Sequence, residues 1–260
     1  MQNSTLSVIE NRRSTRNYAS TPLTGEEKAA ILHAAMRAPT AGNLMLYSIL
    51  EIEDQALKER LAVTCDHQPF IAKAPFVLVF LADYQRQYDY FQYSEVEQKS
   101  HEKGITPRPP QEGDLLLACC DALIAAQNAV IAAESLGIGS CYIGDILEGY
   151  ETHRELLQLP PYVLPITMLC FGRPAVVKAE KRLTPRYDPA YVIFKNTYQR
   201  LSGEEIDAMM RPTAEHAHAD LPLSEAVKAV GQEIYFRKFV SDFSVEMTRS
   251  AREMLKAWSV

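Results

Sequence analysis

The sequence predicts a fold of the α+β or α/β class built on one sheet, because predicted strands and helices alternate along the chain. Residues 75–81, PFVLVFL, form a continuous apolar run typical of a strand covered on both faces. Residues 164–171 have a similar composition, and residues 138–143 are a third candidate for an inner strand. The longest apolar segment, 114–136, is predicted to be a long buried helix.

The elements before the first inner strand are marked by capping residues. A short helix is predicted at 4–11, with Asn3 or Ser4 as its N-cap. Thr24-Gly-Glu-Glu27 matches a capping box and opens a second helix. That helix is expected to close near Ala38, because Pro39 follows. A strand at 47–52 and a helix at 55–62 complete this part.

The remaining chain divides into an excursion and a helical end. Residues 84–110 are polar, aromatic and proline-rich, which predicts a helix followed by a surface excursion. Amphipathic stretches at 203–211, 224–236 and 242–258 predict three C-terminal helices. We therefore expect a core at 1–200, with the excursion at about 84–110, and a helical extension at 201–260. The extension is expected to pack on the core or on a partner subunit.

The helix at 114–136 carries an unusually narrow polar stripe. Asp114, Asp121, Asn128 and Ser135 recur every seven residues, and nearly all other positions are apolar. A surface helix has a wider polar face, so burial is expected, either in one large core or against a second subunit. Five alanines would let another helix approach closely, as in a dimer whose central helices pack together: Ala118, Ala122, Ala125, Ala129 and Ala132.

Composition excludes several classes of protein. The chain has 260 residues, 47% of them hydrophobic, which suffices for one large core or two small ones. A net charge of −6 favours solubility and argues against a broad nucleic-acid surface. Residues 1–7 lack the apolar region of a signal peptide, and polar residues interrupt 115–136, so no membrane span is expected. Five cysteines without C-x-x-C spacing predict neither disulfides nor a zinc site, and indicate a cytoplasmic protein.

Two basic segments could together bind a phosphate. The first, Arg12-Arg13-Ser14-Thr15-Arg16, offers three guanidinium groups and two hydroxyls. Alternatively, these cations could only interact with the partial negative charge at the C-terminal end of the preceding helix, or they could contact nucleic acid. The second segment follows the strand end at 171–174, FGRP, and carries Lys178, Lys181 and Arg182. If it folds back on the first, one phosphate would meet cations from both.

Two loops could contact a flat ligand. Residues 38–43, APTAGN, leave the capped helix with Thr40 and Asn43 as short polar groups, although an ordinary connection has the same composition. Residues 136–145, LGIGSCYIGD, could offer main-chain N–H groups after an apolar strand, and Gly137 suits a helix C-cap. Neither G-x-G-x-x-G nor a Walker A motif occurs, which argues against a tightly held dinucleotide.

Taken together, these segments resemble the FMN-dependent nitroreductase family, in its larger flavin-reductase and oxygen-insensitive branch. The opening pattern of that family, basic-Arg-Ser-x-Arg, is met by residues 12–16, and its A-P-S-x-x-N loop is similar to residues 38–43. Its N-x-x-x-A-A-x-x-x-G-(I/L)-G-(S/G)-C-(Y/W)-I-G pattern resembles residues 128–144. Its G-x-P…K-x-R-L return is matched by Gly172, Pro174, Arg182 and Leu183. HQPF at 67–70 resembles a family segment in which the Gln meets the flavin. The likeness spans residues 6 to about 200.

The resemblance implies an α+β nitroreductase-like fold, with a mostly antiparallel central sheet flanked by helices in an intertwined homodimer. It implies FMN as cofactor and NAD(P)H as co-substrate, in ping-pong reduction of nitroaromatics, quinones or free flavins, with no indispensable catalytic side chain. A flavin carrier or sensor, a reductive dehalogenase and a flavin-fragmenting relative are the alternatives. The implied FMN-binding residues are Arg12, Arg13, Ser14, Arg16, Thr40, Asn43, Gln68, Tyr142, Ile143, Gly144, Asp145 and Arg182.

Three positions complicate the resemblance. Glu180 stands where the larger branch usually has Lys, so Lys178 or Lys181 would have to replace that cation. Asp145 stands where a small residue is common, near the expected reactive edge of the flavin, and its charge could alter the flavin potential or the substrate range. The aromatic cluster at 84–93 could form a substrate lid or simply pack.

Overall fold

The computed structural model describes residues 3–175 and 183–259. The chain divides into two compact units: Met1–Ala179 together with Glu246–Val260, and Glu180–Val245. This division does not follow the boundary predicted at residue 200. Part of the difference comes from the last helix, which belongs to the first unit from Glu246 onward and buries Met254 and Trp258 there. The two units are described separately below.

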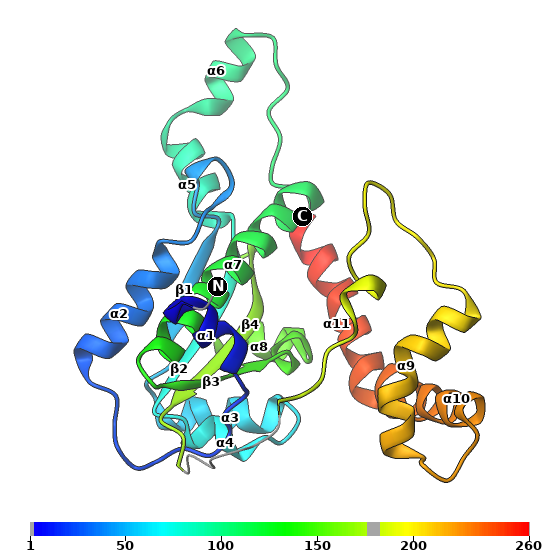
Figure 1. Ribbon diagram of the computed structural model, residues 1–260. Helices are drawn as coiled ribbons and strands as arrows, with labels where there is room; N and C mark the ends of the chain where they lie inside the picture. Colours follow the sequence, from blue (N-terminus) through cyan, green and yellow to red (C-terminus); the bar gives the residue numbers. More distant parts are fainter. Residues whose placement is uncertain (1–2, 176–182, 260) are drawn as a thin grey trace. The chain divides into compact units, whose positions relative to one another are not determined.

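The first unit is built on a four-stranded sheet (Figure 1). The strands are β1 (Tyr47–Glu51), β2 (Phe76–Asp83), β3 (Gly139–Ile143) and β4 (Val163–Gly172), in the order β1-β2-β4-β3. All three strand pairs are antiparallel, which confirms the α+β class and the antiparallel sheet. Pro165 lies in the central strand β4, where it cannot donate to the ladder, and the register with β2 shifts between Phe80 and Leu81.

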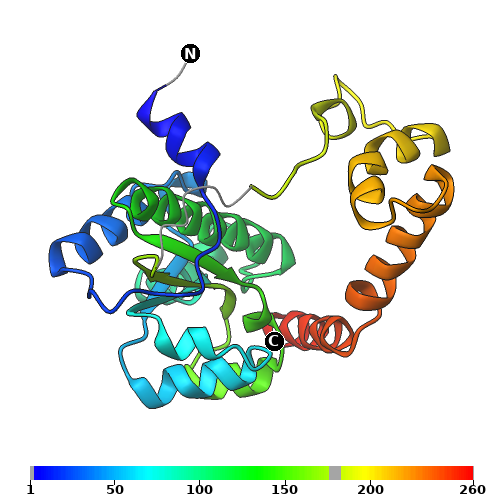
Figure 2. The same cartoon turned by 60° about the horizontal axis from the view of Figure 1, so that its bottom comes forward.

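The sheet is covered on both faces, as the apolar run of β2 predicts (Figure 2). Phe76, Leu78 and Phe80 point to α2 (Gly25–Met36) and α7 (Glu112–Ser135). The alternate residues of β2 point to α3 (Gln55–Thr64) and the short α4 (Pro69–Lys73). Every residue of β2 is buried, because strand side chains alternate between faces that are both packed.

The predicted caps are present. Asn3 caps α1 (Ser4–Asn11) by accepting from the Leu6 N–H at 2.8 Å. Thr24 and Glu27 form the capping box of α2, which ends at Met36. The excursion contains two short helices, α5 (Gln85–Tyr93) and α6 (Val96–Glu102), rather than the single one predicted.

α7 crosses one face of the sheet, and the first three residues of its polar stripe point inward, whereas Ser135 is exposed. Asp114 and Asp121 are buried, and the Asn128 amide donates to the Ala34 oxygen at 3.2 Å. In the described chain α7 is the one helix long and apolar enough to span a membrane, yet it packs against α2 and the sheet. Four apolar side chains on its other side are 40–68% exposed: Leu116, Leu117, Leu123 and Ile124.

The alanines of α7 allow another helix to approach closely, as predicted, but that helix is not from a second subunit. Ala118, Ala122, Ala125 and Ala129 are fully buried within this chain. The helix that approaches three of them closely is α2 of the same chain, through Ile31 and Ala35. Small side chains allow that approach regardless of which subunit supplies the second helix, so the sequence pattern could not distinguish the two.

The second unit contains α9 (Gly203–Ala217) and α10 (Leu223–Ile234), followed by one π-helical turn (Tyr235–Phe239). Ser202 and Glu205 form a capping box on α9, which continues through Pro212 beyond its predicted end. Its small core consists of Met210, Ala214, Ala226, Val227 and Val230.

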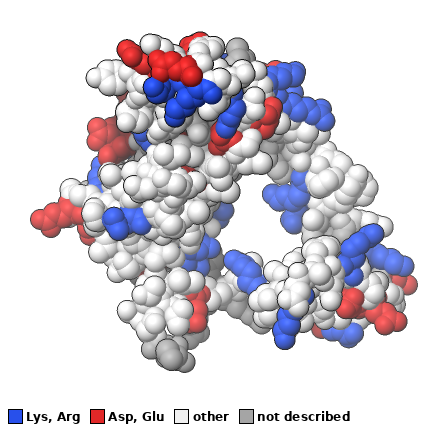
Figure 3. Space-filling view, turned by 90° about the horizontal axis from the view of Figure 1, so that it is seen from above, with Lys and Arg blue, Asp and Glu red and all other residues white. Residues whose placement is uncertain are grey.

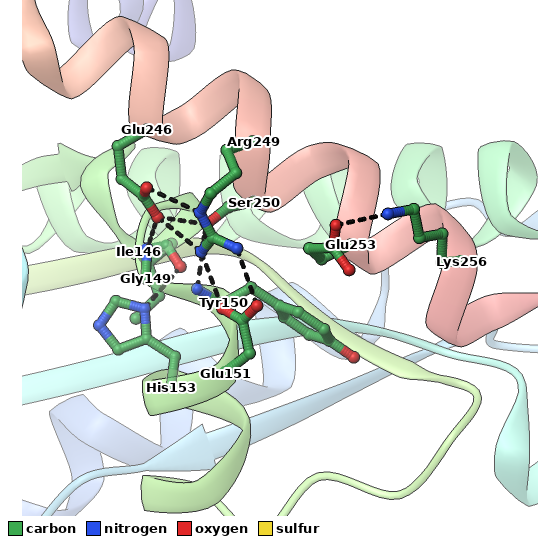
Figure 4. A network of polar contacts seen from close by, with 10 residues as sticks. All are labelled: Ile146, Gly149, Tyr150, Glu151, His153, Glu246, Arg249, Ser250, Glu253 and Lys256. Atoms are coloured by element: carbon green, nitrogen blue, oxygen red, sulfur yellow. Dashed lines mark hydrogen bonds and ion pairs between the residues drawn. The ribbon is translucent and has the colours of Figure 1, made fainter.

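α11 (Asp242–Trp258) returns to the first unit and is held there by a polar network (Figure 4). Arg249 makes a bidentate contact with Glu151 at 2.8 Å and also bonds Glu246. Glu246 accepts from the Gly149 N–H at 3.0 Å, and the Ser250 hydroxyl accepts from the Tyr150 N–H at 3.1 Å. These bonds fix α11 against the start of α8 (Tyr150–Leu156).

Candidate cofactor site

The basic segment after α1 runs along the β3 edge of the sheet. The Thr15 N–H donates to the Ser140 oxygen at 2.8 Å, and Ser14 forms a parallel bridge with Ser140. Gly139 allows this approach, because a Cβ there would lie 2.2 Å from the Thr15 hydroxyl oxygen. Gly139 therefore lets the basic segment pack closely against β3. Gly137, with φ +71°, ends α7 as predicted.

The chain just after the first basic segment is hydrogen-bonded to the described start of the second, whereas a shared phosphate stays a prediction. The Ala19 N–H donates to the Arg173 oxygen at 2.8 Å, and the Ala175 N–H to the Asn17 oxygen at 3.0 Å. Arg173 itself pairs with Glu27 on α2. The predicted cations of the return segment, Lys178, Lys181 and Arg182, lie outside the described residues, as does Glu180.

The guanidinium groups of the basic segment are hydrogen-bond donors that could bind an anion. Arg16 lies over the Phe70 ring, 5.8 Å from its centroid. Within residues 3–175 and 183–259, no carboxylate forms an ion pair with Arg12 or Arg16. Burial raises the pKa of the Cys141 thiol, and the charges of Arg16 and Arg12 oppose that rise. The donors therefore fit a phosphate group.

One half-buried carboxyl group lies near these arginines. Glu134, in the last turn of α7, has a side-chain oxygen that is buried without a hydrogen-bond partner. Burial raises its pKa, while the charges of Arg12 and Arg13 lower it. The residue was not predicted from the sequence, because a Glu near a helix end normally faces solvent.

Gln68 and Asp145 are brought together from distant segments. The Gln68 amide nitrogen donates to Asp145 Oδ2 at 2.7 Å and to the Cys65 oxygen at 2.9 Å. Asp145 begins a short 3₁₀ turn directly after β3 and Gly144. Ile143 is buried, whereas Tyr142 is 36% exposed and its hydroxyl donates to Gln127 at 3.2 Å. The sequence motifs predict Gln68 and Asp145 as separate site residues, and their contact arises only in the folded chain.

Glu148 completes an acidic group beside Asp145. Burial, followed by the neighbouring charges of Asp145 and Asp66, raises the pKa of Glu148 to about 7. One of its oxygens is buried without a hydrogen-bond partner. Sequence reasoning missed this residue, because nothing in the local pattern distinguishes it from a solvated surface Glu. Among the described residues, no group of three or more His, Cys, Asp and Glu side chains could hold a metal ion.

Thr40 and Asn43 lie beside β1, the strand at the opposite edge of the sheet from β3. The Thr40 hydroxyl donates to Asp121 and accepts from the Met45 N–H at 2.8 Å. Asn43 is exposed and has a φ of 57°. Both precede β1, whereas the basic segment lines β3, and β2 and β4 separate these two strands. Among the described residues of one copy of the chain, neither Thr40 nor Asn43 forms a hydrogen bond with Arg12 or Arg16.

The predicted aromatic cluster divides between packing and a cavity. Tyr88 packs edge-on against Tyr162, with ring centroids 5.3 Å apart. Tyr84, Tyr88 and Phe91 line a cavity of about 410 Å³ between α5, α6 and residues 105–110. Tyr93 is 87% exposed. For the cluster at 84–93 as a whole, a substrate lid and simple packing therefore both stay predictions.

The fold and the site define an α+β protein with an arginine-rich segment along one edge of an antiparallel sheet. The family model described as "Nitroreductase family" matches residues 9–173. The chain belongs to this family.

Individual relatives and solved structures agree with this assignment. The chain is 35% identical over 198 residues to a protein of Bacillus subtilis named "FMN reductase (NADPH)", covering 75% of each chain. It is 34% identical to an "Oxygen-insensitive NADPH nitroreductase" of Salmonella typhimurium, covering 76% of this chain and 75% of the relative. The solved structure of B. megaterium NfrA2 aligns with a TM-score of 0.75 and 27% identity, over 99% of this chain and 98% of the other.

Proposed function

We propose that the protein is an FMN-dependent NAD(P)H oxidoreductase that reduces nitroaromatics, quinones or free flavins. The observation that carries this proposal is the arrangement of two groups along β3. The basic segment is hydrogen-bonded along this strand, and no carboxylate of the described residues forms an ion pair with Arg12 or Arg16. The Gln68–Asp145 pair lies at the end of the same strand. The names of the relatives, which include FMN reductase, nitroreductase and NADPH-flavin oxidoreductase, support it.

Each part of the site would hold a different part of FMN. Arg12, Arg13, Ser14 and Arg16 would bind the phosphate, with Arg182 as a further proposed cation outside the described residues. Main-chain N–H groups at 142–145 and the Gln68 side chain would contact the ring, and Thr40 and Asn43 would do so from a second subunit. Bound FMN would supply the hydride-transfer chemistry. The chain itself would bind and orient, without an indispensable acid or base.

A homodimer is part of the proposal. The apolar face of α7 formed by Leu116, Leu117, Leu123 and Ile124 is exposed in one chain, and such a face usually belongs to an interface. A two-fold partner could also bring its own Thr40 and Asn43 to the β3 edge. Leu117→Glu should therefore give a monomer in sedimentation analysis. Val63→Glu, at a similarly exposed apolar position on α3, should stay dimeric.

The electron acceptor and the nicotinamide would use one open face in turn. We propose NADPH as the reductant, following the names of the relatives, and a cytoplasmic location without nucleic-acid or membrane partners. On the face shown in Figure 3, basic and acidic side chains are interspersed in small groups. Such a surface gives little support to nucleic-acid binding.

Two measurements test the proposal. The flavin released from the denatured protein should be FMN, since a phosphate-binding segment without a glycine fingerprint suits one phosphate. Dominant FAD, or a colourless protein that binds no flavin, would contradict this. Initial rates at varied NADPH and nitroaromatic concentrations should give parallel double-reciprocal lines. Intersecting lines would refute the shared face, and a flavin-loaded protein without turnover would favour the carrier alternative.

A further inference from the structure

The side chain of Gln68 is oriented by its two hydrogen-bond partners. Its amide nitrogen donates to the Cys65 main-chain oxygen at 2.9 Å and to Asp145 Oδ2 at 2.7 Å. A main-chain oxygen is only an acceptor, and so is a carboxylate. The opposite amide orientation would place Oε1 against two acceptors, so the chemistry of the partners settles the assignment.

Both amide hydrogens are consumed in this arrangement, which leaves Oε1 as the group that Gln68 can offer to a ligand. Gln68 is half-buried, and within the described residues no group donates to Oε1. An amide with free rotation could offer either a donor or an acceptor. Here, the contact with Asp145 limits it to an acceptor.

The backbone around Gln68 is also fixed. Asp66 and His67 have φ values of 58° and 50°, a left-handed conformation that residues with side chains rarely adopt. The Gln68 N–H closes this turn on the Ala62 oxygen at 2.7 Å, and α4 begins at Pro69. On the other side, Asp145 opens a 3₁₀ turn whose Ile146 is fully buried. The two partners therefore meet from rigid frames.

We propose that Asp145 is a positioning residue, which holds the Gln68 amide so that its oxygen accepts from the ring N–H of the bound flavin. This inference rests on the proposed function. An oxidised isoalloxazine has one ring N–H, at N3, and otherwise presents acceptors and apolar edges. A locked acceptor recognises that group, whereas a locked donor would not.

The test compares FMN with FMN methylated at ring N3, which keeps the phosphate and lacks the donor. The flavin-free protein is titrated with each, and the dissociation constants are read from quenching of flavin fluorescence. The native protein should bind FMN about tenfold or more tightly than the methylated analogue, because the analogue leaves Oε1 unpaired. In Asp145→Ala the ratio should fall severalfold, since only the Cys65 oxygen then opposes rotation of the amide.

Asp145→Asn should largely restore the native ratio, because the Asn oxygen can still accept from Gln68. Asp89→Ala is the matched control. Asp89 accepts from Gln85 at 2.8 Å on the exposed α5 helix, so its loss should leave the ratio unchanged. Circular dichroism of each variant establishes that it is folded. If Asp145→Ala does not fold, Asp145→Ser serves instead, with the same loss of the ratio expected.

The outcomes separate this inference from the function on which it rests. If the native protein binds FMN but does not discriminate against the methylated analogue, the proposed acceptor is wrong and the flavoenzyme proposal stands. If Asp145→Ala weakens both ligands equally and keeps the ratio, Asp145 has only a structural role and the inference is overturned. If the native protein binds neither ligand, both proposals are wrong.

Discussion

The indole N–H of Trp258 donates to the main-chain oxygen of Gln111 over 3.0 Å, which connects the end of α11 to the residue that caps α7. The Trp258 ring is fully buried and packs edge-on against Tyr162, with centroids 5.8 Å apart. The contact joins residues that are 147 positions apart in the sequence. It explains why the last helical turns belong to the sheet-containing unit.

Trp258→Ala should lower the free energy of unfolding by about 3–5 kcal/mol, because a large fully buried ring is removed. Trp258→Phe should also lower the free energy of unfolding. Loss of the indole hydrogen bond should contribute about 1 kcal/mol, in addition to the effect of the smaller ring on packing. Urea denaturation followed by circular dichroism measures both. Arg249→Ala is the comparison on the same helix. Its ion pairs are exposed, so it should lower stability far less than Trp258→Ala does. Equal losses for Trp258→Ala and Arg249→Ala would contradict the assigned role of the ring.

A second stability prediction concerns Asp121 in α7. Its carboxylate accepts from the Thr40 hydroxyl, from the Ala41 N–H at 3.0 Å and from the Leu46 N–H at 3.1 Å. Asp121→Ala would leave these donors without their acceptor in a buried place. We expect it to lower the free energy of unfolding by about 3 kcal/mol or more in the same denaturation assay.

Ser135 provides the control for Asp121, because it lies on the same stripe of α7 two heptads later. It is exposed, and its hydroxyl bonds only the Ala132 oxygen, at 2.7 Å. Ser135→Ala should change stability by no more than about 0.5 kcal/mol. Similar effects of the two substitutions would show that the Asp121 contacts do not stabilise the loop before β1.

The polar stripe on α7 illustrates what the sequence could predict. The period of seven indicated one narrow face correctly, and apolar runs located the inner strands, because both follow from local backbone geometry. Whether the stripe faces the core or solvent depends on partners elsewhere, such as Thr40 and Leu46 for Asp121. The same limit applies to the site. The motifs singled out Gln68 and Asp145, but only tertiary structure brings them together, and Glu148 had no local signal.

The raised pKa of Glu148 predicts a pH dependence of stability. Its pKa in the folded protein is about 7, against an ordinary value of 4.5, so the folded state binds the proton more tightly. This contribution is fully present below pH 4.5 and is lost as the pH rises through about 7. Glu148→Gln removes the ionisation. It should therefore raise the melting temperature at pH 8 relative to the native protein, with a smaller gain at pH 5.

Glu151 should behave in the opposite way, which makes Glu151→Gln a useful control. A hydrogen bond from Arg249 lowers its pKa, so its contribution is present at neutral pH and is lost as the pH falls through that lowered value. The substitution should lower the melting temperature slightly at pH 8, because the pair is exposed. If Glu148→Gln gave the same shift at pH 5 and pH 8, the carboxyl would not titrate in this interval.

The last prediction concerns Arg16 and the phosphate. Arg16→Ala should weaken FMN binding by roughly ten- to a hundredfold, because a charge-assisted hydrogen bond contributes about 1.5–3 kcal/mol. Flavin titration of the flavin-free protein measures this loss. Arg60→Ala removes the same charge from the exposed side of α3 and should leave FMN affinity within about twofold.

The same Arg16 variant also tests where the subunit interface lies. Arg16 contacts Phe70 and the Cys141 region, whereas the exposed apolar face of α7 is formed by Leu116, Leu117, Leu123 and Ile124. Size-exclusion chromatography should therefore give the same mass for Arg16→Ala and the native protein. A folded variant with full FMN affinity would mean that the phosphate binds elsewhere. A monomeric variant would make Arg16 an interface residue, and the loss of flavin would then follow from the lost subunit contact rather than from a missing phosphate bond.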